Sequence, residues 1–137
     1  GVKFKLAVSL HSAVEETRKK IMPFTEHFPL TDLREALEYW YAKTKSRMTY
    51  EYVVWKGVND QQADIDALVE FCRFAPSKVN LIEYNAIGDD AFRQAAPEVI
   101  ERYIQVLERH GITVTVRRSR GKDIDAACGQ LANKSQA

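Results

Sequence analysis

Hydrophobic and polar positions along the chain mark four strand-like stretches. Residues 4–10 form a short apolar run bounded by polar residues, which predicts a buried strand. Residues 49–55 are rich in aromatic and β-branched side chains, residues 79–84 are mostly apolar, and residues 112–116 alternate apolar side chains with threonine. The pattern therefore predicts four strands, distributed along the whole chain.

The segments between these strands carry apolar residues at the spacing of one helical face. Such stripes run through residues 33–41, 65–72 and 99–107. Thr31 or Asp32 is expected to cap the first helix, because a side-chain oxygen at that position accepts hydrogen bonds from free backbone N–H groups. Three long helices are therefore predicted between the strands.

Strands that alternate with helices at this spacing predict βα units and a mainly parallel sheet. Residues 57–60 predict a turn, and Gly111 occupies the usual position after the last helix. The fold class is thus α/β, a partial (β/α) barrel of about four mostly parallel strands with alternating helices. Because the first strand begins almost at residue 1, we expect the chain to be part of something larger.

The amino-acid composition excludes few classes of protein. With 137 residues, 45% hydrophobic and 28% charged, the sequence is typical of one globular domain, residues 1–137, whose basic and small-residue tail spans 117–137. The formal net charge of +1 neither favours nor excludes nucleic acid. No apolar run approaches the roughly 20 residues of a membrane span. Two cysteines are too few for a disulfide scaffold, so a reduced, cytoplasmic setting is expected.

Ligands in parallel α/β folds bind beyond the carboxyl ends of the strands. The residues at those ends are Ser9 and His11, Trp55 to Gly57, Tyr84 and Asn85, and Arg117 and Arg118. They converge on one rim if the strands are neighbours. Ser9, His11 and Asn85 suit a small polar ligand. A histidine after a strand more often caps the next helix or bonds a backbone carbonyl than binds a ligand, and Asn85 equally fits a turn.

Cys128 is flanked by small residues that leave its sulfur accessible. Basic residues at 117–122 lie just upstream, and positive charge favours the reactive thiolate. A small buried cysteine beside a turn accounts for the pattern equally well. Cys72, by contrast, falls on the apolar stripe of its helix and is expected in the core.

Basic residues occur in two clusters, 117–122 and 18–20, which could neutralise RNA phosphates. Such runs are usually solvated faces, so they are weak evidence. His27 and His110 have no cysteine or histidine neighbours at metal-ligand spacing, and no phosphate-binding glycine loop is present. We therefore predict no metal site from these residues.

Six segments occur in an order that is typical of one enzyme family. They are residues 6–11, 21–23, 49–53, 57–60, 79–82 together with Asn85, and 123–131. Together they closely resemble the C-terminal part of the dual-specificity 23S rRNA and tRNA adenine-C2 methyltransferases, a radical S-adenosylmethionine (SAM) family. The resemblance covers nearly the whole chain, and the string around Cys128 is its most specific part.

The resemblance implies roles for individual residues. Ser9, Leu10 and His11 match the family's SAM-contacting segment, Asn85 matches its SAM-binding asparagine, and Cys128 matches the catalytic cysteine that becomes S-methylated. It also implies a barrel of the radical SAM type, SAM and a [4Fe–4S] cluster as cofactors, and 23S rRNA and tRNA as substrates. In the family, the methyl group on the cysteine becomes a carbon radical that attacks C2 of the adenine, and a second cysteine resolves the adduct.

One departure from the family is large. The family's Cys-x3-Cys-x2-Cys cluster motif, its resolving cysteine and its glycine-rich SAM segment do not occur in this sequence. Iron–sulfur clusters need several thiolate ligands, which Cys72 and Cys128 cannot replace. We therefore expect this polypeptide alone to bind no cluster and to be inactive, while the parent protein is the enzyme.

Two alternatives remain open. Related methyltransferases modify C8 of an rRNA adenine, although Asp125 and the Tyr84-Asn85 pair resemble the C2 branch more closely. A non-catalytic half-barrel that binds RNA or a nucleotide would explain the missing cluster motif. Against it, a first strand without a covering element exposes an edge that natural domains protect. The same edge predicts a dimer of the isolated chain through its edge strands.

Overall fold

A computed structural model describes residues 6–85 and 93–120 of the chain. The elements in order are β1 (Ala7–Ser9), α1 (Glu15–Ile21), a 3₁₀ helix (Pro23–His27), α2 (Leu30–Thr44), β2 (Met48–Val54), α3 (Gln62–Cys72), β3 (Ser77–Asn85), α4 (Pro97–Arg109) and β4 (Thr113–Arg120). The four strands and three long helices predicted from the pattern are confirmed, but β1 was predicted as a buried strand over residues 4–10, and within the described residues it spans Ala7–Ser9 and is only partly buried. The sequence pattern did not predict α1, because Ile21 is its one apolar residue and no stripe forms.

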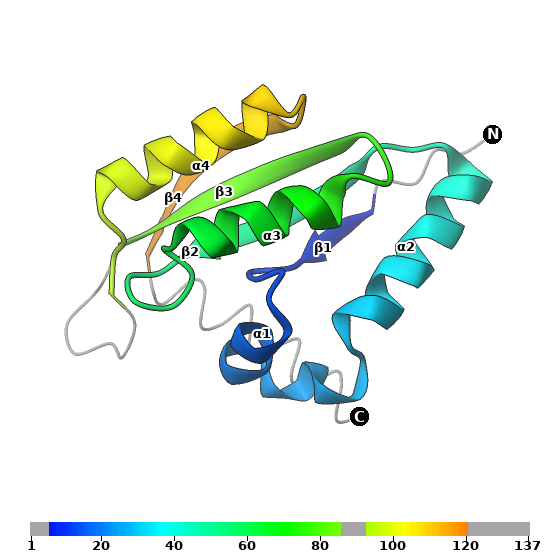
Figure 1. The fold of residues 1–137 in the computed structure, drawn as a ribbon, viewed down its shortest axis with the longest axis horizontal. Helices are drawn as coiled ribbons and strands as arrows, with labels where there is room; N and C mark the ends of the chain where they lie inside the picture. Colours follow the sequence, from blue (N-terminus) through cyan, green and yellow to red (C-terminus); the bar gives the residue numbers. More distant parts are fainter. Residues whose placement is uncertain (1–5, 86–92, 121–137) are drawn as a thin grey trace.

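The four strands form one sheet in the order β1-β2-β3-β4, and every neighbouring pair is parallel. Parallel neighbours require a crossover connection, which α2, α3 and α4 supply in turn (Figure 1). The predicted α/β fold of about four parallel strands with alternating helices is therefore confirmed for the described residues. Among these strands β1 and β4 form the edges of the sheet, and the edge-to-edge dimer stays a prediction.

The two faces of the sheet differ in polarity. Tyr50 and Tyr52 of β2 and Val79 and Leu81 of β3 are fully buried against the helices. The side chains between them point to the opposite side, because successive residues of a strand alternate. We call this side the open face; its polar part carries Ser9, Thr49, Glu51, Lys78, Asn80, Thr113 and Thr115. Nearer the carboxyl ends of the strands, the same face carries Val53, Ile82 and Tyr84, which are buried in a second apolar cluster with Trp55. Only the part of the open face that lies away from the carboxyl ends of β2 and β3 is therefore polar.

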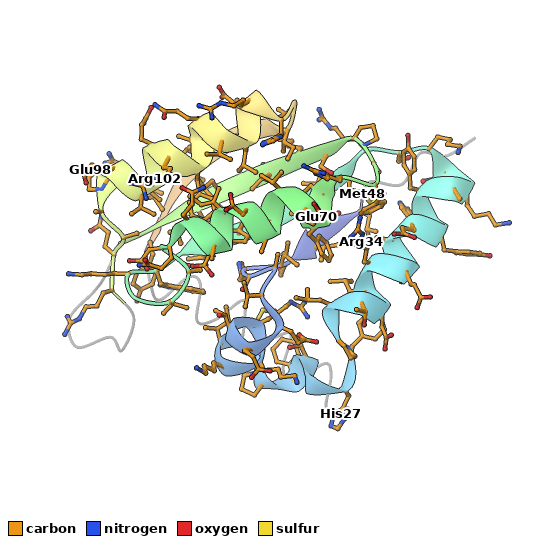
Figure 2. All side chains as sticks on the ribbon, viewed as in Figure 1. His27, Arg34, Met48, Glu70, Glu98 and Arg102 are labelled. Carbon is orange, nitrogen blue, oxygen red and sulfur yellow. The ribbon has the colours of Figure 1, made fainter. Side chains whose placement is uncertain are left out.

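The helices contribute the other half of the core. Met48, at the start of β2, is fully buried where α2 and α3 approach one another (Figure 2). Arg34 reaches from α2 so that its guanidinium lies 5.8 Å from the centre of the Phe74 ring (Figure 2). A cation over an aromatic face is a favourable contact, so it adds to the apolar packing between α2 and the end of α3.

The capping prediction for α2 is wrong. The helix begins at Leu30, so Thr31 and Asp32 lie within its first turn and Pro29 occupies the cap without a side-chain hydrogen bond. The Leu30 N–H donates instead to Glu15 Oε1 at 3.1 Å. Because Glu15 belongs to α1, a rule based on the residues next to the helix could not find this partner.

The fourth strand is longer than predicted. It continues through Arg120, so residues 117–120 pair with β3 and do not begin a tail. Arg118 forms a salt bridge with Glu83 of β3, with 3.4 Å between Nε and Oε2. This pair is exposed at its arginine end and therefore contributes little stability. Within residues 6–85 and 93–120, no helix is both long and apolar enough to cross a membrane.

Replacement of Leu81 by alanine tests the core. Leu81 is fully buried in β3, so Leu81→Ala should lower the free energy of unfolding by about 2–5 kcal/mol, measured by urea denaturation. Val116 pairs with Leu81 but is 46% exposed, so Val116→Ala should change it by less than about 0.5 kcal/mol. Equal effects of the two substitutions would contradict this assignment of the core.

Candidate functional site

The carboxyl ends of the four strands meet at one edge of the sheet, as the sequence predicts for neighbouring parallel strands. Ser9 is the last residue of β1, Asn85 is the last residue of β3, and Trp55 follows β2 directly. Asn85 pairs with Arg120 through the backbone of β4. Cys128, the predicted catalytic residue, lies outside the described residues. We call this edge the rim.

His11 is held by a backbone group at the rim. Its Nδ1 accepts a hydrogen bond from the Val53 N–H at 3.0 Å, so the proton of the neutral ring lies on Nε2. The ring packs edge-on against Trp55, with 5.8 Å between ring centres, and the residue is 5% exposed. The expected structural use of this histidine was a helix cap or a bond to a backbone carbonyl, whereas the ring accepts from a backbone N–H group. Contact with a ligand stays a prediction.

The chain that follows β1 is bound to β2 through its backbone. His11 adopts a left-handed conformation with φ of 55°, which costs a non-glycine residue about 1 kcal/mol. The N–H groups of Leu10 and His11 both donate to the Glu51 carbonyl, at 3.0 and 3.4 Å. Leu10 points its side chain into the core, where it is fully buried. These contacts compensate the unfavourable backbone at His11.

Asn59 completes this attachment, although the sequence analysis placed it only in a turn and in a segment that resembles the family. Its Nδ2 donates to the His11 carbonyl at 2.8 Å and to the Val53 carbonyl at 2.7 Å. Its Oδ1 accepts from the Trp55 N–H at 2.8 Å, and the residue is fully buried. One amide side chain therefore joins the ends of β1 and β2. An asparagine two residues after Gly57 fits an ordinary turn equally well, so no sequence signal separates the two roles.

A pair of buried tyrosines connects Asn59 to α4. The Tyr103 hydroxyl donates to the Asn59 carbonyl at 2.6 Å, and it lies 2.9 Å from the Tyr52 hydroxyl. Because the Tyr103 hydroxyl proton already bonds the Asn59 carbonyl, the Tyr52 hydroxyl is the donor in the bond between the two tyrosines. Burial raises the pKa of both tyrosines, which keeps both hydroxyls protonated and able to donate. The geometry of the rim thus depends on a residue of α4.

Arg18 does not belong to an RNA-binding surface, which corrects the expectation for the basic cluster at residues 18–20. It is 5% exposed, and its Nε donates to the Leu10 carbonyl at 3.2 Å. Burial lowers the pKa of Arg18, and the nearby Glu15 carboxylate partly opposes this effect. The guanidinium therefore fastens α1 to the end of β1.

The open face carries a row of polar side chains, of which the sequence analysis singled out Ser9 alone. Ser9, Glu51, Asn80 and Thr115 are partners in the strand register, one on each strand. A cavity of about 710 Å³ adjoins this row and is lined in part by Glu51, Asn80 and Lys78. The polar residues at 49 and 51, alternating with tyrosines at 50 and 52, were the available signal.

The cysteines of this chain do not fit a [4Fe–4S] cluster. The sequence contains two, and Cys72 is buried in the core, where burial raises the pKa of its thiol to about 12. Its predicted core position is confirmed. In the described part of the chain, no group of three or more His, Cys, Asp or Glu side chains is placed to hold a metal ion. His27 points away from the molecule (Figure 2).

The buried His11 predicts a pH dependence of stability. Burial, with the nearby Arg18 charge, lowers the pKa of His11 from 6.5 to about 4. In this window the unfolded chain binds a proton that the folded protein does not, so the free energy of unfolding falls as the pH falls from 6.5 to 4. The loss is at most about 1.4 kcal/mol per pH unit.

Urea denaturation at several pH values, on the wild type and His11→Gln, measures this contribution by difference. The variant should be less stable at neutral pH and should show a shallower loss of stability on acidification. His110→Gln, at an exposed position after α4, should keep the wild-type slope. Identical slopes for wild type and His11→Gln would show that His11 is not a buried neutral group.

The sequence is similar to those of proteins with a described function. Over 133 residues, 97% of the chain, the sequence is 71% identical to a protein of Flavobacterium johnsoniae described as a probable dual-specificity RNA methyltransferase RlmN. Relatives with the same description are 51% identical over 96% of the chain in Salinibacter ruber and 40% identical over 99% in Geobacillus kaustophilus. The chain spans 36–38% of the length of these relatives. No family profile matches it.

Solved structures place the fold. A radical SAM methyltransferase from Sphaerobacter thermophilus matches with a TM-score of 0.79 and 39% identity, over 93% of this chain and 38% of that one. A domain of pyruvate-formate lyase-activating enzyme from Bacteroides vulgatus shares the fold, with a TM-score of 0.59 and 21% identity over 81% of this chain and 65% of that one. The predicted partial barrel of the radical SAM type is confirmed. Over nearly its whole length, the chain is similar to part of proteins described as probable dual-specificity RNA methyltransferases.

Proposed function

We propose that this chain is part of a radical SAM methyltransferase that methylates C2 of adenine in 23S rRNA and in tRNA. The observation that carries the proposal is 71% identity along 97% of the chain to a dual-specificity RNA methyltransferase. The rim supports it, because it brings the family's SAM-contacting segment to the edge where parallel α/β folds bind ligands. Its RNA substrates place the proposed enzyme in the cytoplasm.

Within this proposal the rim residues bind SAM, which supplies the methyl group when bound. Ser9, Leu10 and His11 form one wall, and their backbone is set by the bonds to Glu51 and Asn59. Asn85, at the end of β3, contributes a second contact. The fixed backbone means that no conformational freedom has to be lost at this wall when the ligand binds.

Cys128 receives the methyl group in the proposed reaction. A cysteine suits this role because sulfur is strongly nucleophilic as a thiolate at modest pKa. The [4Fe–4S] cluster of the family needs thiolates from other parts of the full-length protein, since the two cysteines of this chain do not fit it. The 137-residue chain alone is therefore inactive in this proposal.

Replacement of Cys128 by alanine in the full-length enzyme should abolish methylation. Mass spectrometry of digested rRNA and tRNA measures the product and locates the methyl group on the adenine. Cys72→Ala is the matched control, because Cys72 is buried in the core and its thiol pKa is about 12; this variant should keep activity. Methylation by Cys128→Ala would refute the role of Cys128, and a methyl group on C8 would place the protein in the related family.

Anaerobic reconstitution with iron and sulfide tests whether the cluster ligands lie outside this chain. The full-length protein should bind about four irons per molecule, because the complete set of thiolate ligands is present. The 137-residue chain should bind none in stoichiometric amount. Stoichiometric iron on the short chain would contradict the assignment of the ligands, and none on the full-length protein would favour a non-catalytic RNA-binding or nucleotide-binding module.

A further inference from the structure

The hydrogen bonds along the polar row on the open face all run in one direction, from β4 toward β2. The Thr115 hydroxyl donates to Asn80 Oδ1 at 2.5 Å, and Asn80 Nδ2 donates to Glu51 Oε1 at 3.0 Å. Each of these side chains therefore donates a hydrogen bond to the next one toward β1. The row ends on β2 at a carboxylate, which accepts hydrogen bonds and has none to give when ionised.

The second oxygen of this carboxylate accepts no hydrogen bond from the described residues. Glu51 Oε2 is buried from solvent and has no hydrogen-bond partner. No salt bridge links Glu51 to a lysine or arginine within the ranges that the structure describes. A buried carboxylate oxygen without a donor is unfavourable, because the water that it lost is not replaced. The position therefore favours an incoming donor.

The free oxygen lies beside a residue of the proposed SAM site. Glu51 pairs in register with Ser9, so the two side chains stand next to each other on the open face. Ser9 is the last residue of β1, and the N–H group of the next residue, Leu10, donates to the Glu51 carbonyl. Glu51 therefore lies beside the end of β1, within reach of a ligand that contacts Ser9.

The charge of the group restricts what can occupy this place. RNA presents phosphate oxygens, which a carboxylate repels and cannot donate to. SAM carries an α-ammonium group and two ribose hydroxyls, all of which donate hydrogen bonds, and a positive sulfonium. A carboxylate next to Ser9 thus fits SAM and disfavours the RNA backbone.

We propose that Glu51 is a SAM-binding residue, whose Oε2 accepts a hydrogen bond from a donor group of SAM, either the ammonium or a ribose hydroxyl. This inference rests on the proposed function, since it takes SAM as the ligand of the rim. Asn80 acts behind Glu51 as a positioning residue that holds its other oxygen in place. Thr115 contacts Asn80 and not Glu51, so it lies outside the proposed binding site.

Glu51→Gln in the full-length enzyme is the sharpest test. The substitution keeps the shape and an oxygen for Asn80, but replaces the free acceptor with an NH₂ donor. The Kd for SAM, measured by equilibrium binding, should rise about tenfold or more, as expected for loss of a charged hydrogen bond. Thr115→Val removes the far end of the row and leaves the carboxylate, so its Kd should stay within about threefold of the wild type.

A second ligand identifies the donor group. 5′-Methylthioadenosine has the ribose hydroxyls of SAM but lacks the ammonium group. If Glu51→Gln weakens both ligands equally, the donor is a ribose hydroxyl; if it weakens SAM alone, the donor is the ammonium. Both results support the proposal.

The thermal unfolding midpoint of each variant separates binding from folding. If Glu51→Gln binds SAM as tightly as the wild type while its midpoint falls as in Thr115→Val, Glu51 only stabilises the sheet and the inference is overturned. If the wild-type full-length protein itself binds no SAM, the proposed function fails instead. The two failures are therefore distinguishable.

Discussion

The parallel pairing of the four strands is the constraint on which both the rim and the open face depend. Parallel register brings every carboxyl end to one edge, so residues that are about 75 positions apart in sequence, such as Ser9 and Asn85, share a rim. The same register aligns Glu51 with Asn80 across the sheet. Because side chains alternate along a strand, a shift by one residue would send the polar row into the core and the tyrosines to the open face.

The periodicity of apolar residues was sufficient to predict the elements and the edge at which they meet. A strand such as β3 and a helix such as α4 each bury one set of regularly spaced side chains, and this spacing is visible in the sequence. The place of Ser9 and Asn85 at strand ends followed from the same pattern. Their roles in binding came from the family resemblance, and the structure leaves these roles as proposals.

What the sequence could not provide is the set of bonds between distant residues. Asn59 bonds the His11 carbonyl across 48 positions, and Glu15 caps α2 from 15 positions away. Arg18 lies in a basic run that is typical of a solvated face, yet it is buried against Leu10. Local rules weigh only neighbours in sequence, so each of these polar groups was assigned to solvent, to a turn or to no partner.

The tyrosine pair that joins α4 to Asn59 makes the rim and α4 one cooperative unit. Tyr103 bonds Asn59, and the Asn59 amide holds the backbone after β1, so α4 cannot separate from the sheet without loosening the rim. Binding and helix docking are then thermodynamically linked. A ligand that binds only the ordered rim slows hydrogen exchange of the α4 amides, although it touches none of them.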